Sequence, residues 1–236
     1  MARLRHWLCA TLLLATAAIA ANAQTPAPID VHLRLAIPKG SARHALPAAV
    51  VWFKPLEGTP PDPFPPTKAY TLLQKNRMFK PHLLVIPVGS SVQFPNADPF
   101  FHNVFSLFDG KRFDLGLYEA GSTKSVTFSR EGVSYIFCNI HPEMSAVILT
   151  LSTSLYSVAD RHGEFQIPNV PAGDYEMHIW IEGASQPDLN RMTRRVHLTR
   201  ESGDLGLVEA PSILIKSEPH SNMYGQPYDR DGKSPY

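Results

Sequence analysis

The sequence lacks the long uninterrupted segments that build helical bundles. It contains 22 prolines against 14 glycines, and its aromatic and β-branched residues are spread along all 236 positions. Such frequent interruption favours short strands joined by loops over long helices. No repeat of the solenoid or propeller kind is visible. We therefore expect an all-β protein.

The sequence also lacks an excess of charge of one sign. The chain has 22 lysines and arginines against 21 aspartates and glutamates. Nucleic-acid binding requires a basic surface, which this balance does not indicate. Nucleic acid is therefore not an expected partner.

Cysteine is scarce, and an N-terminal signal would remove one of the two. Arg3 and Arg5 precede an apolar run that ends in Ala21-Asn22-Ala23, a pattern that signal peptidase can cut. We interpret residues 1–23 as a cleaved signal, which predicts a periplasmic or secreted protein. The run is too short for a comfortable bilayer span and no stop-transfer segment follows, so we expect no membrane insertion of the mature chain.

Cleavage leaves 20 basic residues of the 22 against 21 acidic ones, because Arg3 and Arg5 are lost. It also leaves Cys138 as the only thiol. A lone exported cysteine can form an intermolecular disulfide, lie inert in a core, or bind a metal. The residues near Cys138 in the sequence indicate which of these three states is expected.

Two groups of strands are expected, on either side of a proline-rich break. Residues 29–35 alternate apolar and polar, and residues 48–53 form a compact apolar run. Residues 59–66 cannot sustain a ladder or a helix, so they form a linker or surface loop. Short apolar segments then recur between turn signals, as in a β-sandwich: 83–88, 91–94, 104–107, 124–128, 133–137 and 146–151. We interpret residues 113–118 as a structured loop.

A second unit begins near Ser154. Residues 160–175 give the pattern turn, strand, turn, strand, and residues 176–181 continue by alternation. Further strands are expected at 196–198 and 213–215. The polar residues 217–236 have little to bury and are expected to form a flexible tail.

One loop between two strands contains three potential metal donors. The strand that ends at Phe137 continues into Cys138-Asn139-Ile140-His141-Pro142-Glu143-Met144. His102 lies 36 residues before the cysteine, at the start of another strand. Two imidazoles and a thiolate, with a thioether at longer distance, form the donor set of a blue-copper electron-transfer site. We predict one type 1 copper ion held by His102, Cys138, His141 and Met144.

Each donor taken alone is a weak signal, because a methionine near a C-x-x-H pair is usually core packing. The joint occurrence of all four carries the prediction. Zinc would accept the cysteine and two histidines but would want water or a carboxylate in place of the thioether, so copper is preferred. We expect Glu143 to be solvated and His82 to be a packed or surface histidine.

The residues Phe101-His102-Asn103-Val104 and Cys138-x-x-His141-x-x-Met144 resemble the cupredoxin family, and the short gap before Met144 is more like amicyanin than plastocyanin. The resemblance covers residues 66–152 and implies a cupredoxin Greek-key β-sandwich. It also implies that Asn103 ties the two ligand-bearing loops together near the thiolate, which would tune the potential. The same segments are similar to exported plastocyanin-like proteins that are often labelled methylamine-utilisation proteins.

The second unit, with Asp160-x-x-Gly163-x-Phe165-x-Ile167 and a later Tyr175, is similar to small carboxypeptidase regulatory-like sandwiches of transthyretin type, which are structural. Their first strands often read like residues 48–52. Residues 29–57 would then pair with 153–210, and the cupredoxin would be an insertion. Alternatively, residues 29–57 belong to the cupredoxin.

Together these features predict an exported single-electron carrier rather than an enzyme. A c-type cytochrome, a dehydrogenase or an oxidase would be its redox partner, with His141 as the exit for the electron. A copper storage or delivery protein, and an interaction module with a vestigial copper site, stay open as alternatives. Multicopper oxidase chemistry would require a His-Cys-His cluster, which is absent, and no nucleophile setting for hydrolysis is visible.

Overall fold

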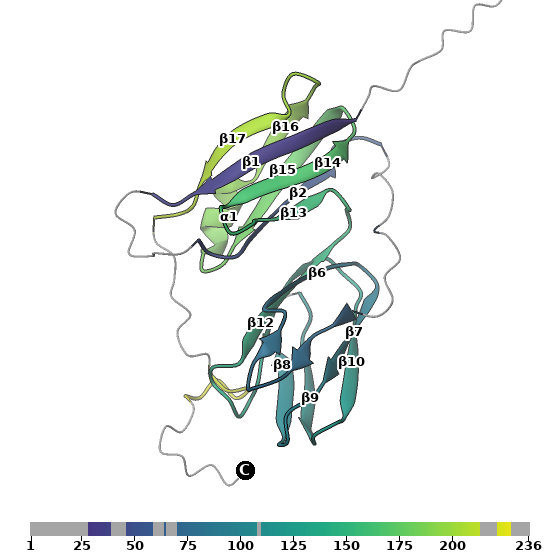
Figure 1. The fold of residues 1–236 in the computed structure, drawn as a ribbon, viewed down its shortest axis with the longest axis vertical. Helices are drawn as coiled ribbons and strands as arrows, with labels where there is room; N and C mark the ends of the chain where they lie inside the picture. Colours follow the sequence, from purple (N-terminus) through teal and green to yellow (C-terminus); the bar gives the residue numbers. More distant parts are fainter. Residues whose placement is uncertain are drawn as a thin grey trace, which may run out of the picture.

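In the computed structural model, two β-sandwiches are stacked along the long axis of the molecule (Figure 1). The structure describes residues 28–38, 46–58, 64, 70–107, 110–212 and 221–227. The signal expected at 1–23 and the strand expected at 213–215 lie outside these residues. Within the described part, the fold is β throughout except for one short helix, which the expectation of an all-β protein did not include.

The lower half in Figure 1 comprises β3 to β12, and we name it the ligand sandwich. One sheet has the order β6-β12-β11-β8-β9, the other has the order β10-β7-β3, and β4 pairs with β5. The bounds are β3 (Tyr70–Thr71), β4 (Leu73–Gln74), β5 (Phe79–Lys80), β6 (Leu83–Pro87), β7 (Ser90–Pro95), β8 (His102–Ser106), β9 (Phe113–Tyr118), β10 (Thr123–Phe128), β11 (Gly132–Phe137) and β12 (Ser145–Leu151).

The upper half comprises strands from both ends of the chain, and we name it the split sandwich. Its sheets have the orders β14-β1-β17 and β13-β2-β15-β16. The bounds are β1 (Ile29–Ala36), β2 (Ala49–Pro55), β13 (Tyr156–Val158), β14 (Glu164–Val170), β15 (Gly173–Ile181), β16 (Arg194–Leu198) and β17 (Asp204–Glu209). β2 pairs with β15 over seven residues, so the ligand sandwich is inserted between β2 and β13.

β12 shows how the two sandwiches are joined. Six of its seven residues are buried, as a continuous apolar run predicts for a strand covered on both faces. Ala146 and Ile148 belong to the core of the ligand sandwich. Val147, Leu149 and Leu151 belong to the core of the split sandwich. The outer face of this sheet is therefore packed against the second unit.

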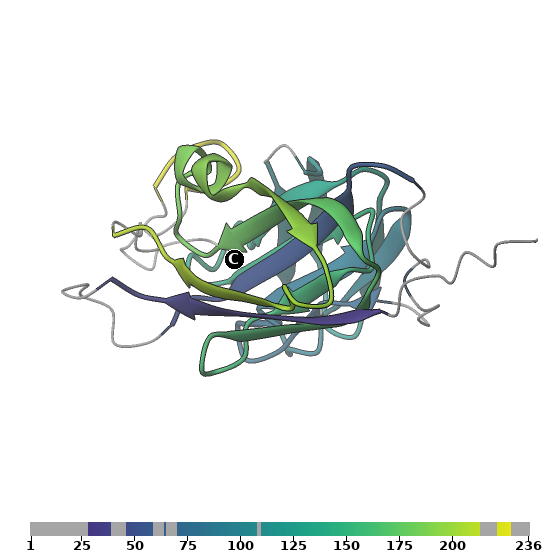
Figure 2. The same ribbon diagram turned by 90° about the horizontal axis from the view of Figure 1, so that it is seen from above.

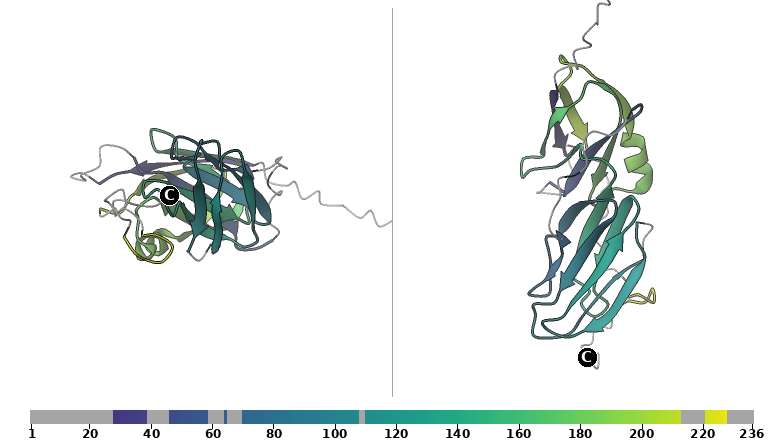
Figure 3. Two further views of the ribbon diagram at one scale, coloured as in Figure 1. Left: turned by 90° about the horizontal axis from the view of Figure 1, so that it is seen from below. Right: turned by 90° about the vertical axis from the view of Figure 1, so that its right-hand side faces the viewer.

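The helix α1 (Gln186–Met192) lies beside β15, on the side of its sheet opposite β1 (Figure 2). Ser185 caps its N-terminus by accepting a hydrogen bond from the Asp188 backbone N–H, and Leu189 is buried. The side view places α1 close to the junction of the two sandwiches (Figure 3). No helix in the described ranges is long and apolar enough to span a membrane.

Residues 113–118 form strand β9, not the structured loop that we expected. Phe113, Leu115 and Leu117 alternate with Asp114 and Gly116, but aspartate and glycine are weak strand formers and Gly116 has a φ of 64°. The segment is nevertheless paired with β8, with a register shift between Asn103 and Phe105. Pairing with a neighbouring strand, rather than local propensity, therefore makes this segment a strand.

Candidate metal centre

Two neighbouring strands bring the histidine and the cysteine of the predicted site together. His102 opens β8, Cys138 directly follows β11, and Phe137 pairs with Phe105 across these strands. The loop from Cys138 to Met144 is closed by two backbone hydrogen bonds. The Met144 N–H donates to the His141 carbonyl at 3.1 Å, and the Cys138 N–H donates to the Met144 carbonyl at 3.3 Å. A short loop pinned in this way holds its side chains in a fixed arrangement.

Three of the four predicted donors converge on one point. The Nδ1 atoms of His102 and His141 are 3.1 Å apart, and Cys138 Sγ lies 3.8 Å from the first and 3.5 Å from the second. All three atoms lie within 4.8 Å of one another. His102 and Cys138 are fully buried, whereas His141 is half-buried.

These separations fit a bound transition-metal ion. Imidazole nitrogens and thiolate sulfur bind such an ion at about 2.0–2.3 Å, which places three donors around one ion roughly 3.3–3.8 Å apart. The observed separations are close to this range. The residues present therefore fit a single copper ion, with only a small increase in the separation of the two Nδ1 atoms.

Asp98 fixes the orientation of His102. Its Oδ2 lies 2.9 Å from His102 Nε2, and both side chains are almost completely buried. Burial raises the pKa of Asp98, but hydrogen bonds from the backbone N–H groups of Arg77 and Asn76 and from His102 outweigh it and lower the pKa. The carboxylate is therefore ionised and accepts a hydrogen bond from the Nε2–H group, which leaves His102 Nδ1 free to act as a ligand.

The thiol of Cys138 needs a cation in order to ionise. Burial raises the pKa of the Cys138 thiol, although backbone N–H groups of Asn103, Ile140 and His141 act in the opposite direction. A buried thiolate is unfavourable without a compensating positive charge. A metal ion bound here would supply that charge and release the proton.

Phe100 packs against both imidazoles. Its ring centroid lies 5.2 Å from that of His102 and 5.6 Å from that of His141. The guanidinium of Arg77 lies above the same ring, 5.3 Å from its centroid. Burial is the main cause that lowers the pKa of His141, and the nearby positive charge of Arg77 lowers it further, so this imidazole is neutral near pH 7. Phe101 is 53% exposed and does not share this packing.

Met144 and Glu143, the two candidates for a fourth donor, differ in burial. Met144 is fully buried in the same core cluster as Cys138, whereas Glu143 is exposed. The solvated carboxylate agrees with the expectation from the sequence. Of the two, only Met144 lies in the apolar core that also contains Cys138, and an apolar core suits a thioether rather than a carboxylate.

Asn103 contacts the ligand loop through its backbone. Its side-chain amide donates to Asp114 Oδ1 on β9 at 2.7 Å, while its backbone N–H bonds to the Cys138 sulfur. The Asn103 Oδ1 atom is buried without a hydrogen-bond partner among the described residues. The backbone of Asn103, and not its side chain, therefore connects the segment that carries His102 to the loop that carries Cys138.

The sequence reasoning missed Asp98 and its neighbour Asn96. Both lie in Asn96-Ala97-Asp98-Pro99, between the expected strands at 91–94 and 104–107, where the sequence analysis assigned no site residue. Asn96 donates to the Phe100 carbonyl at 2.8 Å and accepts from the Asp98 N–H at 3.0 Å, so it shapes the segment that carries Asp98. The signal that could have identified the contact between Asp98 and His102 is the position of an aspartate four residues before a ligand histidine.

Residues outside the four donors also contact the ligand loop. Within the expected tail, residues 221–227 are described, and the Met223 N–H donates to Asn139 Oδ1 at 2.8 Å. His82 Nδ1 lies 3.2 Å from the carbonyl of Ser145, the residue after Met144. His82 Nε2 lies 2.8 Å from Glu182 of the split sandwich, so this histidine links the two halves.

No family model matches the chain, and no curated protein matches it. Several solved structures are similar to part of it. A purple cupredoxin from Nitrosopumilus maritimus is 24% identical with a TM-score of 0.32, over 35% of this chain and 99% of that one. A mutant of amicyanin with Cu(I) is 19% identical with a TM-score of 0.34, over 35% and 82%. A Cu-containing nitrite reductase from Thermus scotoductus SA-01 is 21% identical with a TM-score of 0.35, over 50% and 28%.

Proposed function

We propose that this protein binds one copper ion at His102, Cys138, His141 and Met144 as a type 1 centre and carries single electrons. The observation that carries the proposal is the convergence of two imidazole Nδ1 atoms and the sulfur of Cys138 within 4.8 Å, at a site where His102 and Cys138 are fully buried. Met144 is buried in the same core cluster as Cys138, whereas Glu143 is exposed, and this difference supports copper over zinc.

The bound copper would supply the one-electron couple between Cu(II) and Cu(I). The chain holds the donors in a fixed arrangement, so little structural change accompanies oxidation and reduction. Asp98 maintains the tautomer of His102, and the backbone N–H groups around Cys138 stabilise its thiolate form. These contacts preorganise the site before the metal binds.

His141 is the route for electrons in this proposal. Of the three converging donors, it alone is only half-buried, while His102 and Cys138 have no exposed surface. The exchange partner would be a c-type cytochrome, a dehydrogenase or an oxidase in the periplasm, and the chain itself would not be an enzyme. Contact at the exposed edge of His141 would give the partner the shortest path to the site.

An optical and EPR titration with Cu(II) tests the proposal. The mature protein, purified from an oxidising compartment, is expected to bind one equivalent and to show an intense thiolate-to-copper band. Cys138→Ser should abolish that band, and His141→Gln should weaken or abolish it. His162→Gln is the matched control, because His162 is an exposed histidine of the split sandwich, far in sequence from the donors.

Other outcomes separate the alternatives. A folded protein that binds no Cu(II), with Cys138 reduced and reactive, would contradict the proposal and favour an interaction module. Tight binding with rapid metal loss and slow electron self-exchange would favour copper delivery. Tighter binding of zinc than of Cu(I), measured by competition, would contradict the assignment of the metal.

A further inference from the structure

A segment near the C-terminus returns to the ligand sandwich after the last strand of the split sandwich. β17 ends at Glu209, and residues 221–227 lie beside the ligand sandwich (yellow in Figure 1). We name residues 221–227 the C-terminal turn. A polar segment near a chain end is ordinarily free to move unless specific contacts hold it. Its position beside the predicted metal site therefore depends on such contacts.

The side chain of Asn222 organises the C-terminal turn. Asn222 Oδ1 accepts the backbone N–H groups of Tyr224 at 2.9 Å and of Gln226 at 3.0 Å. The Asn222 N–H donates to the Gln226 carbonyl at 2.8 Å, and the Gly225 N–H donates to the Asn222 carbonyl at 2.9 Å. Gly225 has a φ of 76°, which glycine adopts without strain. The turn therefore keeps its shape through its own hydrogen bonds.

The backbone N–H of Met223 is directed to the ligand loop and not into the turn. It donates to Asn139 Oδ1 at 2.8 Å, across 84 residues of sequence. Both residues are half-buried. Among the described residues, no other hydrogen bond reaches the side chain of Asn139. A turn that holds its own shape thus offers one donor to the loop that carries Cys138.

Asn139 lies in the part of the ligand loop that the two closing backbone bonds do not restrain. Those bonds join Met144 to His141 and Cys138 to Met144. Between them, the Ile140 N–H bonds to the Cys138 sulfur. The orientation of this N–H depends on the peptide bond between Asn139 and Ile140. A contact that restrains Asn139 therefore also maintains the hydrogen bond to the ligand sulfur.

We propose that the C-terminal turn restrains the ligand loop through the hydrogen bond from Met223 to Asn139 and so slows the loss of the bound metal ion. Met223 and Asn139 are positioning residues, because they act through the Ile140 N–H and are not metal donors. For the metal ion this rests on the proposed copper site, whereas in the metal-free protein the same restraint shields Cys138. Opening of the loop breaks one more hydrogen bond when the turn is in place.

Two substitutions remove this contact from opposite sides. Asn139→Ala removes the acceptor on the loop, and Asn222→Ala removes the side-chain oxygen that shapes the turn. On the mature chain, whose only thiol is Cys138, modification by an aromatic disulfide is timed without metal. Transfer of copper to a Cu(I) chelator is timed on the loaded protein. Each substitution should raise both rates about threefold to tenfold, as expected for the loss of one hydrogen bond.

The double variant and the reduction potential separate this contact from a local loss of packing. Because both substitutions remove the same contact, the double variant should react no faster than either single variant, whereas independent effects would multiply. The potential should fall in each variant. A weaker contact from the Ile140 N–H leaves more negative charge on the sulfur, which favours Cu(II).

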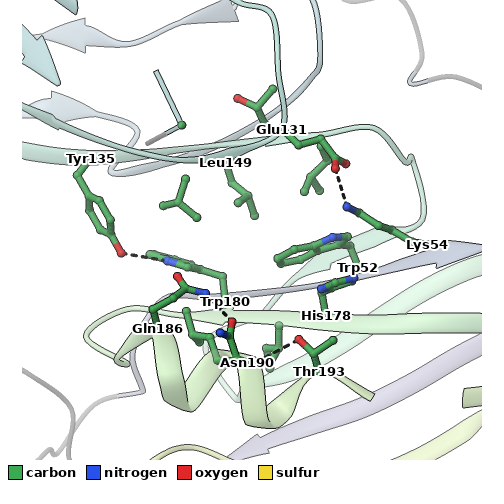
Figure 4. A pocket seen from close by; sticks show the side chains of 17 residues that line it. Trp52, Lys54, Glu131, Tyr135, Leu149, His178, Trp180, Gln186, Asn190 and Thr193 are labelled. Atoms are coloured by element: carbon green, nitrogen blue, oxygen red, sulfur yellow. Dashed lines mark hydrogen bonds and ion pairs between the residues drawn. The ribbon is translucent and has the colours of Figure 1, made fainter. Parts of the chain in front are cut away.

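Asn190→Ala is the matched control. Asn190 lies on α1 and lines a cavity of about 410 Å³ between the two sandwiches, where its Oδ1 accepts from Gln186 at 2.8 Å (Figure 4). The substitution removes the same kind of hydrogen bond outside the ligand sandwich. It should change neither rate and should leave the potential unaltered.

The outcomes for the turn and for the copper site can be told apart. A thiol reaction in Asn222→Ala as slow as in the unchanged protein would overturn the restraint, and so would effects that multiply in the double variant. A protein that binds no copper but reacts faster in both single variants would overturn the proposed function and leave the restraint of the loop in place.

Discussion

The Nε2–H group of His102 donates a hydrogen bond to Asp98 Oδ2 at 2.9 Å, in a contact where the side chains are 0% and 3% exposed. The carboxylate also accepts the backbone N–H groups of Asn76 at 2.6 Å and Arg77 at 3.0 Å. The loop between β4 and β5 therefore supports one metal donor of the site through Asp98. A carboxylate on the far nitrogen of a ligand imidazole raises its basicity and favours the more highly charged metal ion.

Asp98→Asn should weaken Cu(II) binding and raise the reduction potential. The amide keeps an acceptor for His102 but removes the negative charge that favours Cu(II). Loss of such a partner typically costs about 10–100-fold in metal affinity, and each tenfold loss for Cu(II) relative to Cu(I) raises the potential by about 59 mV. Redox titration and metal competition give the two quantities.

The matched control for this substitution is Asp174→Asn, because Asp174 pairs with His197 at 2.8 Å on the exposed surface. It should change neither quantity. Equal potentials for Asp98→Asn and the unchanged protein would show that Asp98 has no influence on the metal.

Met144→Leu should raise the potential and leave the fold intact. Leucine has a similar volume, so the free energy of unfolding should fall by less than about 1.5 kcal/mol. The loss of the thioether removes a donor and favours the lower coordination that Cu(I) prefers. Voltammetry and the optical spectrum measure the effect.

Met177→Leu replaces an equally buried methionine in the split sandwich and serves as the control. It should not alter the spectrum. A potential and self-exchange rate for Met144→Leu that match the unchanged protein would rule out the axial role of this residue.

The His82–Glu182 contact should make stability depend on pH. The hydrogen bond from His82 to Glu182 raises the pKa of His82 above its ordinary value of 6.5, despite partial burial. The protonated form is therefore favoured in the folded state. Its contribution is fully present below about pH 6.5 and is lost as the pH rises through the folded pKa.

Because the His82 side chain is 46% exposed, this contribution should be below about 1 kcal/mol. Urea unfolding at pH 6 and pH 8 should show a smaller difference in the free energy of unfolding for His82→Gln than for the unchanged protein. His162→Gln is the control, because His162 does not take part in the His82–Glu182 contact, and it should keep the pH dependence of the unchanged protein. An identical pH dependence in His82→Gln would refute the effect.

Gly110→Ala should destabilise the ligand sandwich. A Cβ atom at this position would lie 2.5 Å from the Val133 carbonyl oxygen and 2.5 Å from Ser134 Oγ. The backbone of β11 would have to move, at a cost of about 1–3 kcal/mol in the free energy of unfolding. Chemical denaturation measures it.

Adding Ser134→Ala to this variant removes only the side-chain clash, since the Val133 carbonyl remains. The double variant should therefore recover little stability. Full recovery would show that the clash with Ser134 Oγ, and not the clash with the Val133 carbonyl, causes the loss of stability in Gly110→Ala.

The sequence by itself determined the features that depend on residues close together in the chain. Cys138, His141 and Met144 share one loop of seven residues, so their grouping follows from local spacing. The apolar run of β12 indicated a buried strand for the same reason, because burial on both faces leaves a continuous hydrophobic pattern. The position of His102 at the start of a strand was also readable from the turn before it.

Only the tertiary structure decided the relationships between distant residues. The sequence left open whether residues 29–57 pair with the C-terminal strands, and the register of β2 with β15 is set by side-chain packing across more than a hundred residues. The role of Asp98 could not be read from the sequence, because its contact with His102 depends on the conformation of residues 96–99. The cavity lined by β2, β12 and β15 exists only because the two sandwiches meet there, and no local pattern encodes a contact between segments so far apart in the sequence.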